Sequence, residues 1–317
     1  MRIGLTGGAS TTDKIVRQAQ KAEADGFTSL WYASTVAGDP LTALAVAGRE
    51  TSSIELGTAV LQTYPVHPLL QANRVAAVAE AMGRPGFTLG LGPSHESLVR
   101  DVYGMSYDRP GRNTEEYVRI VTALLRGEDV DFQGGEWSTR SEGRMTPVAH
   151  EVPVLLSAMS PRMLRVAGQY ADGTVLWMAS AKVVESVISP AIRTAAEKAG
   201  RPSPRIVAGL PVAVHDDADE ARAAVAATAT MYAGMPNYQR VLEVGGRAPR
   251  RRRDRRHRRV RPRPTAEPAR RRRHRRLGRD LPRRRRRARL GPADAELLEF
   301  PHYPVGASRA EIGFAHL

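Results

Sequence analysis

Three stretches of the chain place small or polar residues at the end of a short apolar segment, and chemistry is expected there. They are Gly57–Gln62, Gly90–His95 and Ser157–Ser160. His95 follows a Gly-Pro-Ser turn, where an imidazole can give or take a proton near pH 7. A single histidine after a strand is more often structural or solvent-facing than catalytic. His95 is therefore a candidate that needs further support.

The stretch Ser157–Ser160 leads into Pro161, which is typical of the first turn of a helix. Free N–H groups at a helix start can bind a phosphate, and serine hydroxyls with Arg162 would add donors. The alternative is that Ser160 simply caps the helix. On the residues alone the two interpretations are equally supported.

Several other kinds of site are excluded or weak. The chain has no cysteine, so thiol catalysis, disulfides and thiolate metal sites are ruled out. The pair Gly90-x-Gly92 lacks the third glycine of a dinucleotide fingerprint, and neither a metal-ligand spacing nor a G-x-S-x-G motif occurs. Trp31 and Tyr32 could wall a planar ligand, although core packing is the simpler interpretation of Trp31.

Alternating strands and helices must position these residues. Seven short apolar segments are predicted as strands: 2–6, 29–32, 54–61, 87–91, 152–157, 174–178 and 206–214. Helical patterns follow them at 12–24, 40–50, 68–82, from about 96, 114–126, 161–170, 181–199 and 216–232. A small β-hairpin is expected within 130–145. This alternation predicts a parallel sheet with right-handed crossovers.

Seven such units plus one more would close an α/β fold of the (β/α)8 TIM-barrel type, in which active sites lie at the carboxyl ends of the strands. We therefore assign residues 1–246 to a barrel domain. The eighth strand and helix should lie where residues 247–290 stand, so we expect this unit to be missing or replaced. Residues 291–317 are left unassigned. Because 298–317 has no clean strand or helix period, strands one and seven are expected to have open edges.

Residues 247–290 carry 24 Arg and no Lys, and they account for the net charge of +15 of the whole chain. A nucleic-acid-binding tail would explain the Arg, with affinity that falls steeply with salt. A disordered linker is a second interpretation. A frameshift in a GC-rich gene is the third, because GC-rich codons read out of frame yield Arg, Pro, Ala and Gly. We favour the frameshift, so nucleic acid is not the expected partner.

Residues 1–246 are mildly acidic, with 23 Lys and Arg against 26 Asp and Glu. The chain lacks both a signal-peptide pattern and a run of about 18 apolar residues that could span a membrane. We therefore expect a cytoplasmic enzyme that acts on a small molecule.

Together the strand ends resemble the luciferase-like monooxygenase superfamily, and more narrowly its actinobacterial members that use coenzyme F420, the deazaflavin analogue of FMN. The resemblance spans residues 1–246 in the family's order. Its most specific stretches are "AEADGFTSLWYAS", "SIELGTAVLQTYPVHPLLQA", "GRPGFTLGLGPSHE" and "VPVLLSAMSPRMLRVAGQYADGTVLWMA". It implies an F420-dependent oxidoreductase, with an FMN-dependent monooxygenase of the same fold as the alternative. A homodimer would be usual for the superfamily.

The resemblance also implies site residues. A non-prolyl cis peptide that backs the cofactor ring would fall at Ala59–Val60, Ser157–Ser160 would bind the cofactor phosphate, and His95 would stand where related dehydrogenases have an acidic proton donor. The implied cofactor-binding residues are Gly57, Thr58, Ala59, Val60, Gln62, Gly92, Pro93, Ser94, Ser157, Ala158, Met159 and Ser160.

One departure from the family changes the expected reaction. Related deazaflavin dehydrogenases carry an Asp-His pair after the second strand, whereas this chain has Ala33-Ser34. Their sugar-phosphate mechanism therefore does not transfer. Reduction of an activated C=C or C=N bond, or another hydride transfer, is expected instead.

Overall fold

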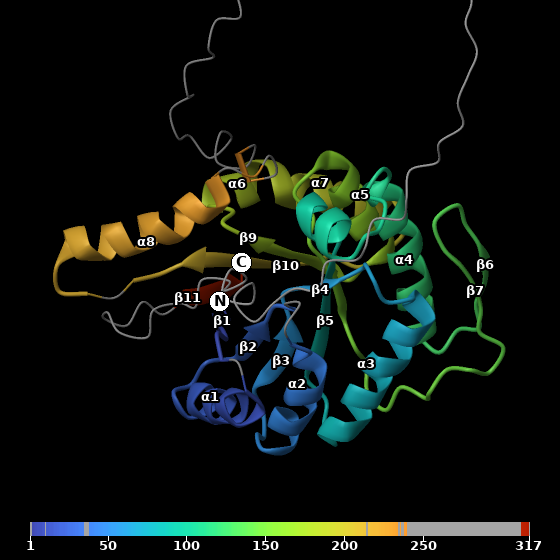
Figure 1. Cartoon of the computed structure of the whole chain (residues 1–317), viewed down its shortest axis with the longest axis horizontal. Coiled ribbons are helices and arrows are strands. Elements are labelled where there is room, and N and C mark those ends of the chain that lie inside the picture. Colours follow the sequence, from blue (N-terminus) through green and yellow to red (C-terminus); the bar gives the residue numbers. More distant parts are fainter. Residues whose placement is uncertain are drawn as a thin grey trace, which may run out of the picture. The chain divides into compact units, whose positions relative to one another are not determined.

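Seven parallel strands and one antiparallel strand form the central sheet of the protein, in a computed structural model that describes residues 2–9, 11–34, 38–213, 215–233, 235, 238–239 and 312–316 (Figure 1). The strands are β1 (Ile3–Thr6), β2 (Ser29–Tyr32), β3 (Glu55–Thr58), β4 (Leu61–Gln62), β5 (Phe87–Gly92), β8 (Val154–Leu156), β9 (Gly173–Trp177), β10 (Arg205–Pro211) and β11 (Ile312–His316). β3 and β4 are two parts of the third predicted strand. The predicted barrel is confirmed.

Helices follow the strands, as the alternation of the sequence predicts. They are α1 (Thr12–Ala24), α2 (Pro40–Arg49), α3 (Pro68–Met82), η1 (Leu98–Val102), α4 (Pro110–Leu125), α5 (Pro161–Tyr170), α6 (Ala181–Val183), η2 (Val184–Ile188), α7 (Ser189–Lys198) and α8 (Ala218–Ala233). Proline occupies the first turn of α2, α3, α4 and α5. Its fixed φ and missing N–H suit that position, which is why these helices begin where they do.

The sheet closes because its outermost strands pair. β3 pairs with β5 through Leu56 and Gly57, so β4 is a short branch at the carboxyl end of the third strand. On the other side, β11 lies between β1 and β10 (Figure 1). Apolar residues of the strands and of the inner helix faces fill the space between the two layers.

The expectation that strands one and seven have open edges was wrong. β11 pairs antiparallel with both neighbours, with Ala315 opposite Ile3 and Phe314 opposite Gly209. The segment was missed because a five-residue strand between two partners is held by backbone pairing and needs no alternating pattern. Among the described residues, a single strand of opposite direction therefore stands where the eighth parallel strand was expected. The remainder of 247–317 lies outside the described residues.

The predicted hairpin is present as β6 (Asp131–Gln133) and β7 (Ser138–Arg140). The carboxylate of Glu116, on α4, holds its turn. It accepts the N–H groups of Gly135 at 3.0 Å, Glu136 at 2.8 Å and Trp137 at 2.9 Å. A carboxylate that accepts this many N–H groups is a strong local tie between an insertion and its helix.

Charged groups close the amino-terminal end of the barrel. Both guanidinium Nη atoms of Arg205 donate to Glu55, at 2.6 and 2.9 Å. The Thr88 hydroxyl at 2.6 Å and Arg2 at 2.7 Å complete the contacts of this carboxylate. Burial acts to raise the pKa of Glu55, but the hydrogen bonds and charge of Arg205 outweigh it and lower the pKa below its usual value. The cluster joins β3, β5, β10 and the residue before β1.

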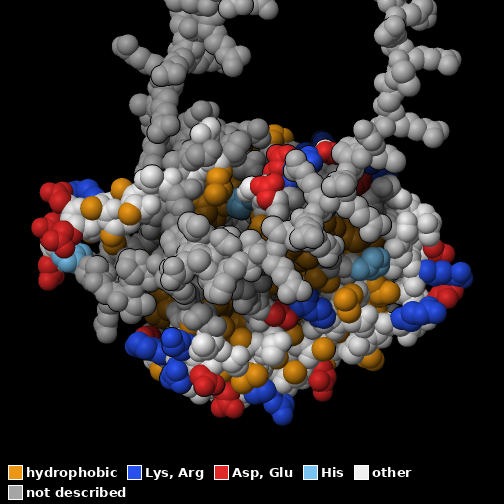
Figure 2. Space-filling model, in the orientation of Figure 1, with side chains coloured by type: hydrophobic (Ala, Val, Ile, Leu, Met, Phe, Trp, Pro, Cys, Tyr) orange, Lys and Arg blue, Asp and Glu red, His pale blue; other side chains and the backbone are white. Residues whose placement is uncertain are grey.

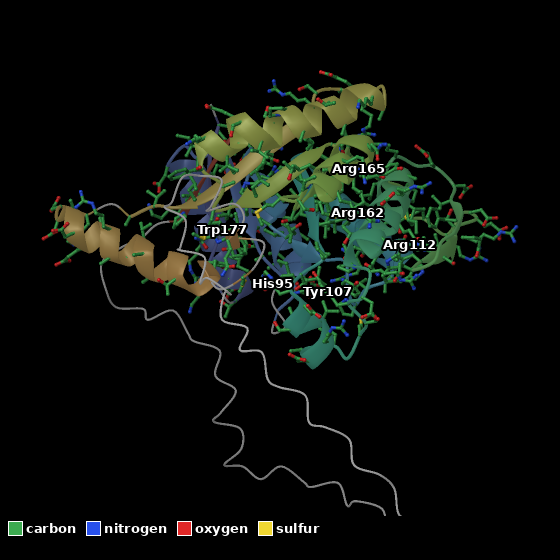
Figure 3. The ribbon with its side chains drawn as sticks, turned by 90° about the horizontal axis from the view of Figure 1, so that it is seen from above. His95, Tyr107, Arg112, Arg162, Arg165 and Trp177 are labelled. Atoms are coloured by element: carbon green, nitrogen blue, oxygen red, sulfur yellow. The ribbon has the colours of Figure 1, made fainter. Side chains whose placement is uncertain are left out.

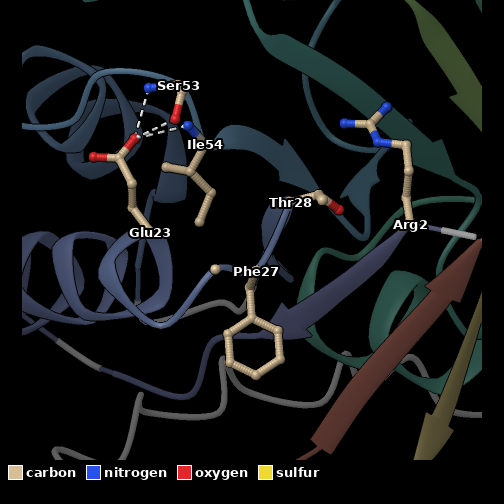
Figure 4. Close-up of a pocket in the computed structure, with 7 residues that line it drawn as sticks. Arg2, Glu23, Phe27, Thr28, Ser53 and Ile54 are labelled. Atoms are coloured by element: carbon tan, nitrogen blue, oxygen red, sulfur yellow. Dashed lines mark hydrogen bonds between the residues drawn. The ribbon is translucent and has the colours of Figure 1, made fainter.

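A surface pocket at the same end is also structural (Figure 4). Glu23, on α1, accepts the N–H groups of Ser53 at 2.6 Å and Ile54 at 2.9 Å. Burial acts to raise the pKa of Glu23, yet the hydrogen bonds from residues 52–54 together outweigh it and hold the pKa at about 2. The carboxylate in this pocket therefore stabilises the loop before β3.

Candidate functional site

The three predicted stretches meet at the carboxyl ends of β4, β5 and β8. Gln62 pairs with Gly92 across β4 and β5, and the N–H of Ser157 donates to the carbonyl of Leu91 at 2.7 Å. A Cβ atom on Gly92 would lie 2.8 Å from Cγ2 of Val60 and 3.2 Å from Cβ of Ser157. Gly92 is therefore the point of contact between the three strand ends.

The non-prolyl cis peptide expected at Ala59–Val60 is confirmed. The end of β2 holds this peptide from one side, because Ala59 N–H donates to Tyr32 at 2.8 Å and Ser34 N–H donates to Val60 at 3.2 Å. Ala59 and Val60 pack on a cluster in the barrel interior that contains Trp31. They form a small, half-exposed apolar platform at the rim.

The structure divides the implied cofactor residues into two groups. Four are buried: Gly57, Thr58, Gly92 and Ala158. The Thr58 hydroxyl donates to Gly90 O and accepts from Gly90 N, both at 2.9 Å, so it locks β3 to β5. The other implied residues are half-buried at the rim: Ala59, Val60, Gln62, Pro93, Ser94, Ser157, Met159 and Ser160. The first group supports the site, and the second group can contact a ligand.

His95 lies at this rim and is half-buried. Its carbonyl accepts the N–H of Val99 at 3.1 Å, and Ser94 before it has a φ of 67°, which is unusual for a residue other than glycine. The ring of Tyr238 lies 6.4 Å from the imidazole, centroid to centroid. Burial lowers the pKa of His95, so near pH 7 the ring is neutral and carries one N–H donor and one acceptor nitrogen.

Two tyrosines beyond β5 reach the same rim and were not predicted from the sequence. The Tyr107 hydroxyl donates to the carbonyl of Ser94 at 2.9 Å, and the Tyr103 hydroxyl donates to Oε1 of Gln62 at 2.6 Å. The ring of Tyr64 lies 5.8 Å from that of Tyr107. In the sequence, the spacing of the two tyrosines in Tyr103-x-x-x-Tyr107 was the available signal.

An aromatic and thioether cluster borders His95 on the other side. It comprises Met159, Trp177, Met178, Tyr232, Met235 and Tyr238. The ring centroids of Tyr232 and Tyr238 are 5.0 Å apart, and those of Trp177 and Tyr232 are 5.9 Å apart. Trp31, in contrast, is fully buried, with its indole N–H donated to Ser29, so its core interpretation is confirmed.

Of the two interpretations that the sequence left open for the helix start after β8, capping is confirmed, and phosphate binding stays a prediction. Ser160 caps α5, because its Oγ accepts Met163 N–H at 3.3 Å. Arg162 is paired with Glu115 at 3.2 Å, while Arg165 is exposed one turn further along. In Figure 3, His95 lies between Trp177 on one side and the arginines of α4 and α5 on the other.

Other kinds of site find no support in the described part of the chain. His, Asp and Glu residues do not cluster there as metal ligands. Among the described helices, none combines the length and apolar character needed to cross a bilayer. On the face drawn in Figure 2, the Lys and Arg side chains are interspersed with Asp and Glu, so the described surface there has no single-sign patch for nucleic acid.

Comparisons with known proteins show the family of the chain. The sequence profile of the family described as "Luciferase-like monooxygenase" matches residues 2–278. The chain is 30% identical over 237 residues to 5,10-methylenetetrahydromethanopterin reductase of Methanolobus tindarius, covering 74% of this chain and 71% of that protein. It is 31% identical over 228 residues to the F420-dependent hydroxymycolic acid dehydrogenase of Mycobacterium tuberculosis, covering 67% and 62%.

A solved structure supports the fold. The coenzyme F420-dependent tetrahydromethanopterin reductase of Methanopyrus kandleri superposes with a TM-score of 0.65 at 23% identity, over 77% of this chain and 76% of that one.

Proposed function

Because the chain belongs to the luciferase-like monooxygenase family, we propose that it is an oxidoreductase that transfers a hydride between coenzyme F420 and a small organic substrate. The observation that carries the proposal is the half-exposed apolar platform at the cis peptide Ala59–Val60. This platform lies against Gly92 at the end of β5, next to Ser157 after β8. The choice of coenzyme F420 over FMN is supported by the relatives, one of which is named as an F420-dependent dehydrogenase and another as a reductase.

The residues at the rim fit a flat cofactor with an anionic tail. Ala59 and Val60 offer an apolar surface to one face of a ring, and Gly92 lets that surface and Ser157 come together without a side chain between them. Ser157 and the first turn of α5 would take the phosphate, since helix N-termini favour anions. The bound deazaflavin would supply the hydride.

His95 would supply or accept the proton that accompanies hydride transfer. Its neutral ring can hold a proton on one nitrogen and accept at the other, at the rim beside the platform. Ala33 and Ser34 follow β2, and neither titrates near neutral pH. Reduction of an activated C=C or C=N bond therefore suits the site better than a mechanism that needs a second acid or base there.

The test is a fluorescence titration of the full chain with oxidised coenzyme F420 and, separately, with FMN. We expect the deazaflavin to bind at least tenfold more tightly, a difference of about 1.4 kcal/mol. Tighter binding of FMN together with oxygen consumption would favour a flavin monooxygenase. Binding of neither cofactor would remove the proposal.

We propose further that residues 247–290 come from a shifted reading frame and take no part in the reaction. The support is their composition, with 24 Arg and no Lys among 44 residues. Resequencing the gene tests this directly. If the frame is intact and the segment alone binds DNA with steep salt dependence, a nucleic-acid function replaces it.

We also propose that the protein is cytoplasmic, in keeping with the mild acidity of residues 1–246. A homodimer is expected from the family, and size-exclusion chromatography with light scattering measures it. Fractionation of producing cells tests the location.

A further inference from the structure

Tyr103 and Tyr107 lie in the segment between β5 and α4, and they reach back to different parts of the candidate site. Tyr103 stands directly after η1, and Tyr107 lies in the loop before α4. Tyr103 contacts a side chain of the implied cofactor site, Gln62, whereas Tyr107 contacts the backbone beside His95. The two hydroxyls thus hold two different groups of the candidate site, the side chain of Gln62 and the backbone beside His95.

The bond from Tyr107 fixes the peptide that carries His95. The carbonyl of Ser94 and the N–H of His95 belong to one planar group, so holding the carbonyl oxygen also holds the nitrogen of His95. The following peptide is held too, because the His95 carbonyl accepts the N–H of Val99 at 3.1 Å. The Cα of His95 is therefore pinned between two fixed peptide planes, and its imidazole starts from a defined direction.

The Tyr107 bond falls on Ser94, a residue with an uncommon backbone conformation. Its φ of 67° lies in the left-handed region, which residues other than glycine, asparagine and aspartate seldom adopt. The Tyr107 hydroxyl holds the carbonyl of this serine in place. The Tyr107 ring is braced by Tyr64, which is 3% exposed. Burial and the nearby Glu96 carboxylate raise the pKa of Tyr107, so the hydroxyl keeps its proton and donates it.

The bond from Tyr103 fixes an amide. Since the Tyr103 hydroxyl donates to Oε1 of Gln62, the amide oxygen is occupied and the Nε2 group is the part of Gln62 that remains for a ligand. Gln62 pairs through its backbone with Gly92, the point where the strand ends meet. An oriented amide donor at this place would contribute to cofactor binding.

We propose that Tyr107 is a positioning residue for the proton-transferring His95, and that Tyr103 is a positioning residue for Gln62 in the cofactor site. The inference rests on the proposed function for the role of the cofactor, while the link between Tyr107 and His95 is a property of the protein alone. The two tyrosines separate proton transfer from cofactor binding, although they lie four residues apart.

The experiment compares Tyr107→Phe, Tyr103→Phe and the control Tyr170→Phe in the full chain. Each variant loses a hydroxyl and keeps its ring. Tyr170 lies at the end of α5, where its ring contacts Arg119. Two quantities are measured: the ¹H–¹³C NMR signal of the His95 imidazole without cofactor, and the Kd for oxidised coenzyme F420 by fluorescence. The other seven histidines of the chain serve as internal references for the NMR signal.

Tyr107→Phe should shift and broaden the His95 signal and change the Kd by less than about twofold. Tyr103→Phe should leave the His95 signal in place and weaken the Kd about fivefold, the loss expected for one neutral hydrogen bond. Tyr170→Phe should change neither quantity. The opposite assignment, or equal effects of Tyr107→Phe and Tyr103→Phe on both quantities, would overturn the proposal.

Two further outcomes are covered. If Tyr107→Phe unfolds, the double variant Tyr107→Phe/Ser94→Gly still lacks the hydroxyl but carries a residue that tolerates the φ of position 94, and it should broaden the His95 signal in the same way. An unchanged signal in that variant overturns the Tyr107 role. If the wild-type chain binds neither coenzyme F420 nor FMN, the proposed function and the Tyr103 role fail together, while the His95 signal still decides the Tyr107 role.

Discussion

The two ends of the barrel use their polar groups in opposite ways. At the amino-terminal end, Glu55 is 8% exposed in its side chain and bonds Arg205, Arg2 and Thr88. At the carboxyl end, the rim holds a neutral imidazole, tyrosine hydroxyls and half-exposed apolar residues. At the amino-terminal end the charged groups join strands, whereas at the carboxyl end neutral groups remain available to a ligand. Stability and activity should therefore respond to different substitutions.

Acid should produce the largest effect, and Glu23 and Glu55 at the amino-terminal end should contribute to it together with Glu116 on α4. Glu23 has a pKa of about 2 and that of Glu55 is also lowered, so both bind fewer protons in the folded chain than in the unfolded chain. Their contribution to stability is present above the unfolded pKa of about 4.3 and is lost as the pH falls toward about 2. Urea unfolding at pH 7 and pH 3 measures this loss. Equal stability at both values would contradict it.

Glu55→Gln should lower the free energy of unfolding by about 2 kcal/mol, because the partly buried guanidinium of Arg205 then loses its anionic partner. The cofactor Kd should stay within about twofold. The matched control is Asp25→Asn, which breaks the exposed pair with Lys21 and should leave the unfolding midpoint unchanged. A higher Kd with unaltered stability would contradict the assignment of stability to the amino-terminal end and of binding to the carboxyl end.

Gly92→Ala should have the complementary effect. Its Cβ would lie 2.8 Å from Cγ2 of Val60, a side-chain atom that can move, so stability should fall by about 1 kcal/mol. The displaced Val60 would disturb the platform, and the Kd for the deazaflavin should rise about tenfold. Titration and urea unfolding of the same sample separate the two. A large loss of stability with an unchanged Kd would show that Gly92 serves the core.

Tyr238→Ala should give the smallest effect, confined to the rim. Burial lowers the pKa of His95, and removing the ring beside it should raise that pKa toward the ordinary value, by less than about one unit. An NMR titration of the imidazole measures it, with Tyr170→Ala as the control. A pKa that stays or falls further would mean that other groups desolvate His95.

Local pattern and resemblance predicted most of the framework and part of the site. The seven parallel strands and their helices follow from short apolar segments and Pro-initiated helices, and the hairpin from its Gly-Gly turn. The cis peptide at Ala59–Val60 came from the resemblance and is confirmed. The neutral state of His95 could not be predicted, because it depends on the burial that folding imposes.

What the sequence did not predict depends on partners far away in the chain or on backbone acceptors. Glu55 and Arg205 are separated by 150 positions, and neither residue has a local pattern that marks it. Tyr107 bonds a carbonyl oxygen, which every residue carries, so its partner leaves no trace in the residue types. β11 is short and is defined by two neighbours that are remote in sequence.

The place of β11 between β1 and β10 has a consequence for how the chain acquires its structure on the ribosome. Ala315 pairs with Ile3, so the last seam of the barrel joins segments separated by more than 300 positions. Seven strands emerge and can assemble long before the eighth is made, and during that interval the edges of β1 and β10 lack their final partner. Such remote pairing is slow, and unpaired edges attract other chains. Yield in a cell should thus depend on chaperones and on growth temperature more than the stability of the finished barrel would suggest.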